Sequence, residues 1–400
     1  MKSANRYQIL VLAAVLQLFL GIIYVWSVFV SPVSEAYGWQ VASAKLTSSF
    51  MLGFFVLGML VSGRLERKLG TTKSVLIGGV LLAGGMAATS AIPSGSGWLI
   101  YLTYGIAGGF GVGMGYGAVV SCVPKWFPDK RGMATGVSVC AFGFSTVVFA
   151  PLVEALIGAY TVRTAFLILA AAFLCVTLAL FSFIRLPDSA NSGKAAKTGA
   201  APGDGERQYT TSEALKTGRF YLITFSLMFG TSVFFILNPS FKTLAAERGL
   251  EAFGTMLVMM TGVASALGRL AFPLVSEKIG RETTAAAAIG LTALCAFALS
   301  FAGGFLFMAS VAVCAFCYGG YSGIYPLLSG DHFGLRNVGS NYAAVMCGFA
   351  VSALFFPAVL TGLFSGTALF IALGVIGLAG VALIVILSRS GKRSRQSTPR

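Results

Sequence analysis

Long apolar runs alternate with short polar segments along almost the whole chain. Each run continues for about 18 residues or more, the length an α-helix needs to cross a membrane. Twelve such runs are present, at approximately 7–30, 43–63, 74–93, 97–120, 132–157, 163–185, 219–243, 252–275, 283–302, 304–330, 341–362 and 366–388. A membrane-spanning β-barrel would instead show alternating segments of about ten residues. The pattern therefore predicts an all-α integral membrane protein with twelve transmembrane helices.

One polar segment is much longer than the others. Residues 186–218 are rich in Gly, Ala and Ser, and they separate the first six apolar runs from the last six. This composition predicts a cytoplasmic linker, with a short amphipathic helix on the membrane surface at its "TTSEALKTG" end. We expect an N-terminal six-helix half at 1–185, a C-terminal six-helix half at 219–388 and a basic cytoplasmic tail at 389–400.

The two halves contain a weak internal repeat in the loops that follow corresponding runs. The matched residues are Lys68 and Lys278, Gly70 and Gly280, each pair 210 residues apart, and Phe127 and Phe333, 206 residues apart. Two matches in nearly the same register predict two pseudo-symmetric six-helix halves. This is the architecture of transporters that bind their substrate near the middle of the membrane.

The charged residues are few and unevenly distributed. The chain has 28 Lys and Arg against 13 Asp and Glu, a net charge of +15. If the N-terminus is cytoplasmic, all but five of the basic residues lie in the termini and in loops on the cytoplasmic side. The exceptions are Lys45, Arg163, Lys242, Arg248 and Arg269. The positive-inside rule then places both termini in the cytoplasm of a multi-pass protein of the inner or plasma membrane. Topology and attraction to anionic lipid account for the surplus, so we expect membrane lipid and no nucleic acid as a partner.

Neither a cleaved leader nor a metal site is expected. The first run is too long for a signal peptide and has no small-residue cleavage site. All seven cysteines fall inside predicted spans, and the spacing of "CAFC" at 314–317 is metal-like. No His or carboxylate accompanies that pair, so buried small apolar residues are the better interpretation. We predict no cofactor, metal or catalytic residue.

Several motifs together carry a resemblance to a known family. They are "GIIYVWSVFVSPV" in the first run, "GRLERKLG" after the second, "YGAVVSCVPKWFPDKRGMATG" across the fourth and fifth, "GRLAFPLVSEKIGR" at the eighth and "FGLRNVGSNY" before the eleventh. The chain resembles the major facilitator superfamily over its whole length, and within it the oxalate/formate antiporter family of monocarboxylate-transporter-like proteins. The resemblance implies a secondary active transporter, not an enzyme, which we expect to be monomeric.

The loop after the second run implies a conformational latch, because it has that role in the superfamily that the chain resembles. The usual acid lies where this chain has Arg67, and Glu66 is its neighbour. The expected gating residues are Arg64, Glu66, Lys68, Asp129, Arg131 and Lys278. The alternative is that the basic residues of this loop serve only to set the topology.

Arg269, in "GVASALGRLAF", is the one charge that the pattern places deep in the bilayer. No acid lies in the middle of any predicted span, and burying a guanidinium costs roughly 2.5 to more than 10 kcal/mol. The alternative is snorkelling to the interface, because Ser276 lies only about 10 Å of helix rise away. Lys278 and Arg281 already anchor that end, however. We therefore predict that Arg269 binds the carboxylate of a substrate.

Aromatic residues are the second expected component of the binding site. The predicted residues are Tyr24, Tyr116, Tyr318 and Tyr321, with Trp26 and Tyr325 as weaker candidates. In the family that the chain resembles, positions matching Tyr24, Tyr116 and Tyr318 line the cavity. The alternative for each is an aromatic residue at the membrane interface. Aligned on "NY" at 341–342, oxalate carriers of this family place a lysine where the chain has Phe349. This favours a small monocarboxylate such as formate, lactate or pyruvate over oxalate.

The coupling mode stays open between exchange and proton symport. The candidate proton-coupling residues are His332, Asp331 and Glu154. A proton-coupled drug exporter of the same fold is the main alternative function, but the first and fourth spans lack the acids such exporters tend to use. A membrane sensor or an intramembrane enzyme is less consistent with the sequence. The linker is too short for a signalling domain, and the spans contain no acid–base or metal cluster.

Overall fold

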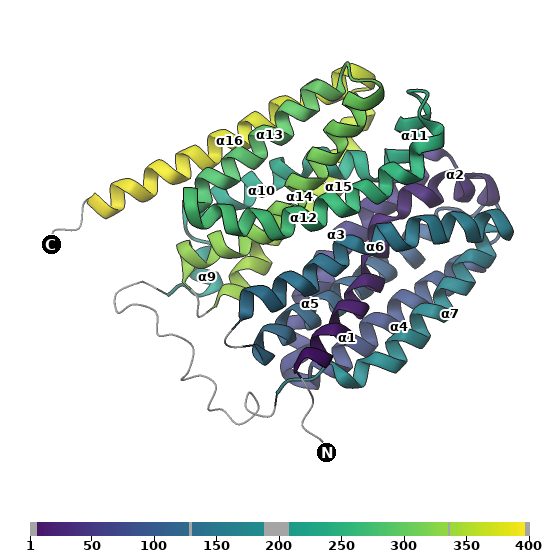
Figure 1. The fold of residues 1–400 in the computed structure, drawn as a ribbon, viewed down its shortest axis with the longest axis horizontal. Helices are drawn as coiled ribbons and strands as arrows, with labels where there is room; N and C mark the ends of the chain where they lie inside the picture. The colour runs from purple at the N-terminus through teal and green to yellow at the C-terminus, as the bar shows by residue number, and fades with distance from the viewer. Residues whose placement is uncertain (1–5, 128–129, 188–207, 335–336, 397–400) are drawn as a thin grey trace. The chain divides into compact units, whose positions relative to one another are not determined.

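A computed structural model describes residues 6–127, 130–187, 208–334 and 337–396, without the side chains of residues 67, 131, 132, 339 and 390–396. This part of the chain contains twelve helical segments that are long and apolar enough to cross a membrane, as the apolar runs predict. The described residues contain helices and no strand. Figure 1 shows these helices as coiled ribbons, coloured from purple at the N-terminus to yellow at the C-terminus.

The chain forms two compact units, Met1–Ala201 with Asn238–Ala266, and Pro202–Leu237 with Leu267–Arg400. The expected halves differ from these units, because Asn238–Ala266 belongs to the first unit and not to the second. The division at the 186–218 linker stays a prediction, and residues 188–207 of that linker lie outside the described residues.

The first unit contains the described helical segments up to Phe183 and three short segments between Asn238 and Phe253. They are α1 (Arg6–Leu20), η1 (Gly21–Tyr24), α2 (Trp26–Tyr37), α3 (Val41–Leu69), α4 (Thr71–Ser90), the π-helical η2 (Tyr101–Gly108), α5 (Gly109–Trp126), α6 (Arg131–Ala159), α7 (Val162–Leu180), η3 (Phe181–Phe183), η5 (Asn238–Ser240), α11 (Phe241–Ala246) and η6 (Glu251–Phe253). In this unit α3 packs on α5, α4 on α5 and α7, and α1 on α6 (Figure 1).

The second unit contains α9 (Thr211–Ala214), α10 (Gly218–Leu237), α13 (Arg281–Leu299), α14 (Gly304–Phe333), α15 (Val338–Leu363) and α16 (Gly366–Gln396). The long helix α12 (Gly254–Ile279) belongs to the first unit up to Ala266 and to the second from Leu267. Here α10 packs on α15 and α16, and α13 on α14 and α16 (Figure 1).

The pattern of the first apolar run predicts one continuous α-helix, but the structure shows a break in it. The α-helical conformation changes to a 3-10 turn at Gly21–Tyr24, and α2 begins at Trp26. A Cβ atom on Gly21 would lie only 2.2 Å from the Phe142 carbonyl oxygen of α6. The break therefore falls where the first segment touches α6. Apolar periodicity does not distinguish α-helix from a short 3-10 segment.

The internal repeat appears in the geometry of both helix corners. Gly70 between α3 and α4 has φ 84° and ψ 160°, and Gly280 between α12 and α13 has φ 90° and ψ 149°. Gly70 N–H donates to the Glu66 carbonyl at 3.0 Å, and Gly280 N–H donates to that of Ser276 at 3.1 Å. Positive φ explains why glycine occupies both positions. The two corners are built alike, as the 210-residue match predicts.

The same repeat appears in two close helix contacts. A Cβ atom on Gly58 of α3 would lie 2.1 Å from the Phe110 carbonyl oxygen in the α5 segment. A Cβ atom on Gly268 of α12 would lie 1.9 Å from the Phe316 carbonyl oxygen of α14. These glycines are 210 residues apart and their partners 206, the offsets found in the sequence. Each unit therefore uses a glycine at the equivalent place to bring two helices into backbone contact.

The end of the linker forms a single helical turn. Thr210 and Glu213 make a capping box around α9, whose sequence begins with Thr211. Tyr209 N–H donates to the Phe333 carbonyl at 2.9 Å, and Thr211 Oγ1 donates to Asn341 Oδ1 of α15 at 3.0 Å. The predicted short helix therefore exists, and hydrogen bonds fasten its start to the second unit.

Candidate functional site

Arg269 belongs to the part of α12 that lies in the second unit, and it is buried. Its residue is only 5% exposed, so its side chain does not extend to the protein surface. The Nε atom donates to Ser322 Oγ of α14 at 3.2 Å, while the Ser322 hydroxyl donates to the Gly319 carbonyl at 2.6 Å. The serine oxygen is thus oriented as an acceptor for the guanidinium. Gly268, directly before Arg269, sets the close approach of α12 to α14 that permits this contact.

Tyr318 lies one helical turn before Ser322 on α14 and belongs to an aromatic cluster. Its ring stacks on Phe234 with centroids 3.8 Å apart and an interplanar angle of 11°. Phe235 meets it edge-on at 5.8 Å, and Phe349 lies 6.1 Å away. Residues four apart share a helix face. One face of α14 therefore presents both the Arg269 contact and this aromatic wall.

Tyr321 and Tyr325 have a different role from Tyr318. The Tyr321 hydroxyl lies 2.8 Å from Thr292 Oγ1 of α13 and donates to the Ala288 carbonyl at 3.2 Å. The Tyr325 hydroxyl lies 2.9 Å from Ser226 Oγ of α10. Both side chains are buried and hydrogen-bond α14 to neighbouring helices. Of Tyr318, Tyr321 and Tyr325, Tyr318 is the one whose ring stacks on a phenylalanine.

Tyr24 and Tyr116 come together in the first unit. The Tyr24 ring meets Phe142 at 5.4 Å, and the Tyr116 ring meets it at 4.9 Å. Phe55 completes the group at 5.2 Å from Tyr116. Trp26 lies apart from this group, because its ring stacks on Tyr104 and its Nε1 donates to the Ala44 carbonyl. Two of the predicted site residues thus contact one phenylalanine of α6.

The expected gating residues differ in exposure. Arg64, Lys68 and Lys278 are exposed, Asp129 lies outside the described residues, and Arg131 begins α6 with its side chain not described. Glu66 is half-buried, and its carboxylate accepts from Ser62 Oγ at 3.0 Å and from Ser121 Oγ of α5 at 2.6 Å. The displaced acid therefore joins the end of α3 to α5.

Glu154 takes part in an ion pair that sequence reasoning did not identify. Its carboxylate lies 2.7 Å from Lys242 Nζ of α11 and accepts from the Thr255 hydroxyl of α12. These contacts join α6 to the Asn238–Ala266 segment of the first unit.

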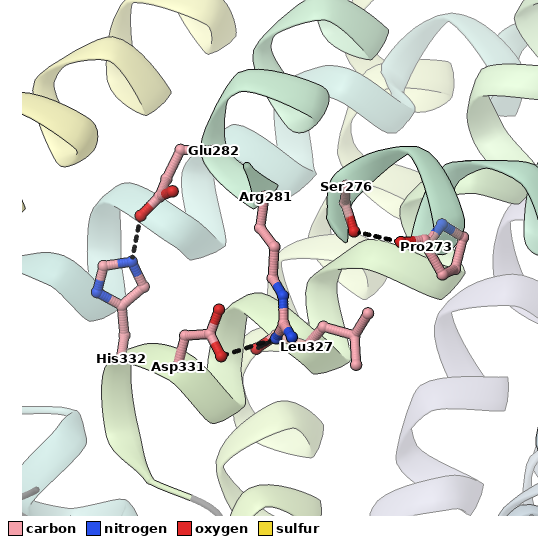
Figure 2. Close-up of polar contacts among 7 residues, drawn as sticks. All are labelled: Pro273, Ser276, Arg281, Glu282, Leu327, Asp331 and His332. Carbon is pink, nitrogen blue, oxygen red and sulfur yellow. Dashed lines mark hydrogen bonds and ion pairs between the residues drawn. The ribbon is translucent and has the colours of Figure 1, made fainter. Parts of the chain in front are cut away.

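Asp331 and His332 also have partners, both at the start of α13. Arg281 donates to the Asp331 carboxylate at 2.7 Å and to the Leu327 carbonyl at 2.9 Å. His332 Nε2 lies 3.2 Å from Glu282 Oε1. Figure 2 shows these two contacts, which fasten the start of α13 to the end of α14. Arg281 and Glu282 were not predicted as site residues, since their partners are about 50 positions away in the sequence.

No cluster of three or more His, Cys, Asp or Glu side chains suited to a metal ion occurs among the described residues. Cys314 and Cys317 of the "CAFC" motif are buried thiols. The chemistry of the described interior thus centres on one buried guanidinium, hydroxyl groups and aromatic rings.

Twelve hydrophobic helices, a duplicated arrangement and a buried cation define the class as a multi-pass helical membrane protein of the transporter type. The chain belongs to the Major Facilitator Superfamily, whose family model matches residues 10–357. It is 24% identical over 360 residues to the uncharacterized MFS-type transporter YhjX of Escherichia coli, covering 88% of this chain and 86% of the relative.

Two further relatives have names that state a substrate. The oxalate:formate antiporter of Oxalobacter formigenes is 25% identical over 363 residues, covering 88% of this chain and 83% of the relative. Monocarboxylate transporter 12 of Xenopus laevis is 26% identical over 328 residues, covering 76% and 69%. The resemblance inferred from the motifs is confirmed at the level of the superfamily and of these homologues.

Proposed function

We propose that the protein carries a small monocarboxylate anion across the membrane by alternating access, and that Arg269 binds the carboxylate. The observation that carries the proposal is a guanidinium that is 5% exposed within a membrane-spanning helix. Arginine stays charged in proteins, and a buried charge needs strong compensation. A carboxylate fits the planar guanidinium bidentately, through charge-assisted hydrogen bonds. The substrate names of the two relatives support the same class of cargo.

The surroundings of Arg269 favour a small monoanion over a dianion. Ser322 receives the Nε hydrogen, which orients the guanidinium. Tyr318 and Phe349, from the same unit, supply aromatic surface, and Phe349 is 7% exposed and apolar. One cation held by Ser322, one helical turn from the Tyr318 ring, suits one carboxylate with a short apolar tail, such as lactate or pyruvate, or formate with none. A second carboxylate would lack a charged partner at the Phe349 position.

Uptake into reconstituted vesicles tests the proposal. Radiolabelled formate, lactate and oxalate are offered to vesicles preloaded with unlabelled carboxylate, and to empty vesicles with an inward proton gradient. Uptake that requires preloading identifies an exchanger, whereas gradient-driven uptake into empty vesicles identifies a proton symporter. The label that is accepted names the substrate.

Arginine variants connect the activity to the site. Loss of the partner of a buried carboxylate costs about 2 kcal/mol or more, so R269A is expected to lower uptake at least roughly thirtyfold. R269K keeps the positive charge but loses the planar, two-pronged set of donors, so its uptake is expected to lie between that of the wild-type protein and that of R269A. R163A is the matched control, because Arg163 donates to Ser94 in an exposed setting. Uptake by R269A with unchanged affinity and rate would overturn the assignment.

A further inference from the structure

The start of α13 and the end of α14 are joined by two side-chain contacts of different kinds (Figure 2). Arg281 lies 2.7 Å from the Asp331 carboxylate, and His332 Nε2 lies 3.2 Å from Glu282 Oε1. Arginine stays charged in proteins, so the first contact is permanent near neutral pH. Histidine is the side chain that ordinarily changes its charge between about pH 5 and 8. The second contact therefore depends on the protonation of one residue. We call these four residues the α13–α14 junction.

The His332 ring occupies a sheltered position in this junction. Its side chain is 9% exposed and that of Glu282 is 32% exposed, while the Phe333 ring lies 6.5 Å away between centroids. A partly buried pair of charges is screened by salt less than an exposed pair. The attraction of opposite charges adds to the hydrogen bond, so loss of the proton from His332 weakens the contact.

The internal repeat shows that this place in the fold does not require an ionisable pair. At the offsets of 210 and 206 residues, Glu282 corresponds to Thr72 of α4, and His332 corresponds to Trp126 of α5. Thr72 Oγ1 and Trp126 Nε1 donate to the backbone carbonyls of residues 184 and 185 at 3.0 and 2.7 Å. The first unit thus joins the corresponding helices through neutral hydrogen bonds. The proton-dependent contact is a property of the second unit, added to a shared architecture.

Other charged groups lie on the elements of this unit that surround the junction. Within the described residues they are Arg219 at the start of α10, Glu277 and Lys278 at the end of α12, and Arg389 near the end of α16. Tyr209 meets the neighbouring Phe333, with ring centroids 6.0 Å apart. In the part of the chain that the structure describes, Glu282 supplies the charged atom within hydrogen-bond distance of the imidazole. The charge of His332 therefore acts most strongly on Glu282.

We propose that His332 and Glu282 form a proton-operated contact that holds the start of α13 to the end of α14 more tightly as the pH falls through neutrality. The contact is strongest at low pH, where the imidazole is charged, and it weakens as the pH rises. The Arg281–Asp331 pair keeps the junction together when His332 is neutral. This device concerns the second unit alone, and it does not depend on the identity of the cargo.

Hydrogen–deuterium exchange of the purified full chain in detergent measures how often the start of α13 opens. Protection is the intrinsic exchange rate of an unstructured peptide at the same pH, divided by the measured rate. The chain contains a single histidine, and Asp, Glu and Cys side chains ordinarily titrate outside the range of about pH 5.5 to 7.5. We expect amides in the first two turns of α13 to be about threefold better protected at the lower pH, the effect of a partly exposed ion pair.

Two variants test the pair from either side. H332Q removes the titrating group and E282Q removes its charged partner, and each should give the same protection at both pH values. Glutamine keeps a polar side chain of similar size, so both variants are expected to fold, as size-exclusion chromatography will show. E277Q is the matched control, because Glu277 is an exposed carboxylate at the end of α12. It should keep the threefold difference.

Equal protection of the unaltered protein at both pH values would overturn the proposal. So would a threefold difference that persists in either H332Q or E282Q. Exchange is measured without any cargo, so a protein that carries no monocarboxylate would refute the proposed function and leave this result unchanged. The two failures are therefore distinguishable.

Discussion

Replacing Gly268 by alanine should separate α12 from α14. The added Cβ would lie 1.9 Å from the Phe316 carbonyl oxygen and 3.0 Å from the Gly320 backbone nitrogen. Real Cβ atoms rarely approach another atom closer than 3.0 Å, so the helices must move apart by about 1 Å, since the obstacle is backbone. Overpacking of this kind costs about 1–3 kcal/mol. The shift would also displace Arg269, the next residue, from Ser322.

A glycine elsewhere provides a control with the opposite expected sign. Gly84 of α4 is exposed, and a Cβ atom there would meet nothing within 4 Å. Alanine is the better helix former by roughly 0.5–1 kcal/mol, so G84A is expected to stabilise the protein slightly. The two variants carry the same chemical change within a helix, so the gain in helix propensity is common to both, and they should differ by the overpacking cost of about 1–3 kcal/mol.

Thermal unfolding of purified protein in detergent measures the difference, together with carboxylate uptake by the same preparations. We expect G268A to lower the Tm by several degrees, since about 1 kcal/mol corresponds to roughly 2–4 °C in domains of 150–250 residues. Uptake should fall with it, while G84A keeps both. If G268A is as stable and active as G84A, the inferred backbone contact between α12 and α14 is wrong.

Three other changes give further tests. E154K or K242E alone places two like charges together and should slow transport by up to about fivefold. This factor corresponds to roughly 1 kcal/mol for an exposed ion pair. The double charge exchange should restore the transport rate in a double-mutant cycle. F349K adds a second cation beside Tyr318 and should allow uptake of labelled oxalate, which the unaltered protein is expected to reject; continued rejection would argue against this position as the determinant of charge selection. E66A removes the acceptor of the buried Ser62 hydroxyl and the contact with Ser121 of α5, and should destabilise the protein by about 1–3 kcal/mol in thermal unfolding, with E66Q affected less. Wild-type stability of both variants would deny the carboxylate a structural role.

The helices and their repeat could be predicted because each rests on local features. Apolar length alone identifies a span, and Gly70 and Gly280 carry a backbone conformation that favours glycine at both corners. The 3-10 turn at Gly21–Tyr24 was missed because it depends on a contact with α6, distant in the sequence. Local pattern does not contain that information.

The candidate site was predictable only where it depends on local sequence pattern. The burial of Arg269 follows from its place in an apolar run, but Ser322 as its partner follows from the register of α12 on α14, which Gly268 sets. Glu154 was predicted as a proton-coupling candidate without its lysine, because Lys242 lies 88 positions away. A hydroxyl or a lysine becomes a site residue only through such distant contacts.

The central claim is that Arg269 binds a carboxylate, and equilibrium binding tests it most directly. Isothermal titration calorimetry of the purified protein with lactate, pyruvate and formate removes any dependence on the coupling mode. We predict saturable binding of at least one of these anions to the wild-type protein and to R163A, and affinity at least roughly thirtyfold weaker in R269A. Binding to R269A with the same Kd as the wild-type protein would contradict the account.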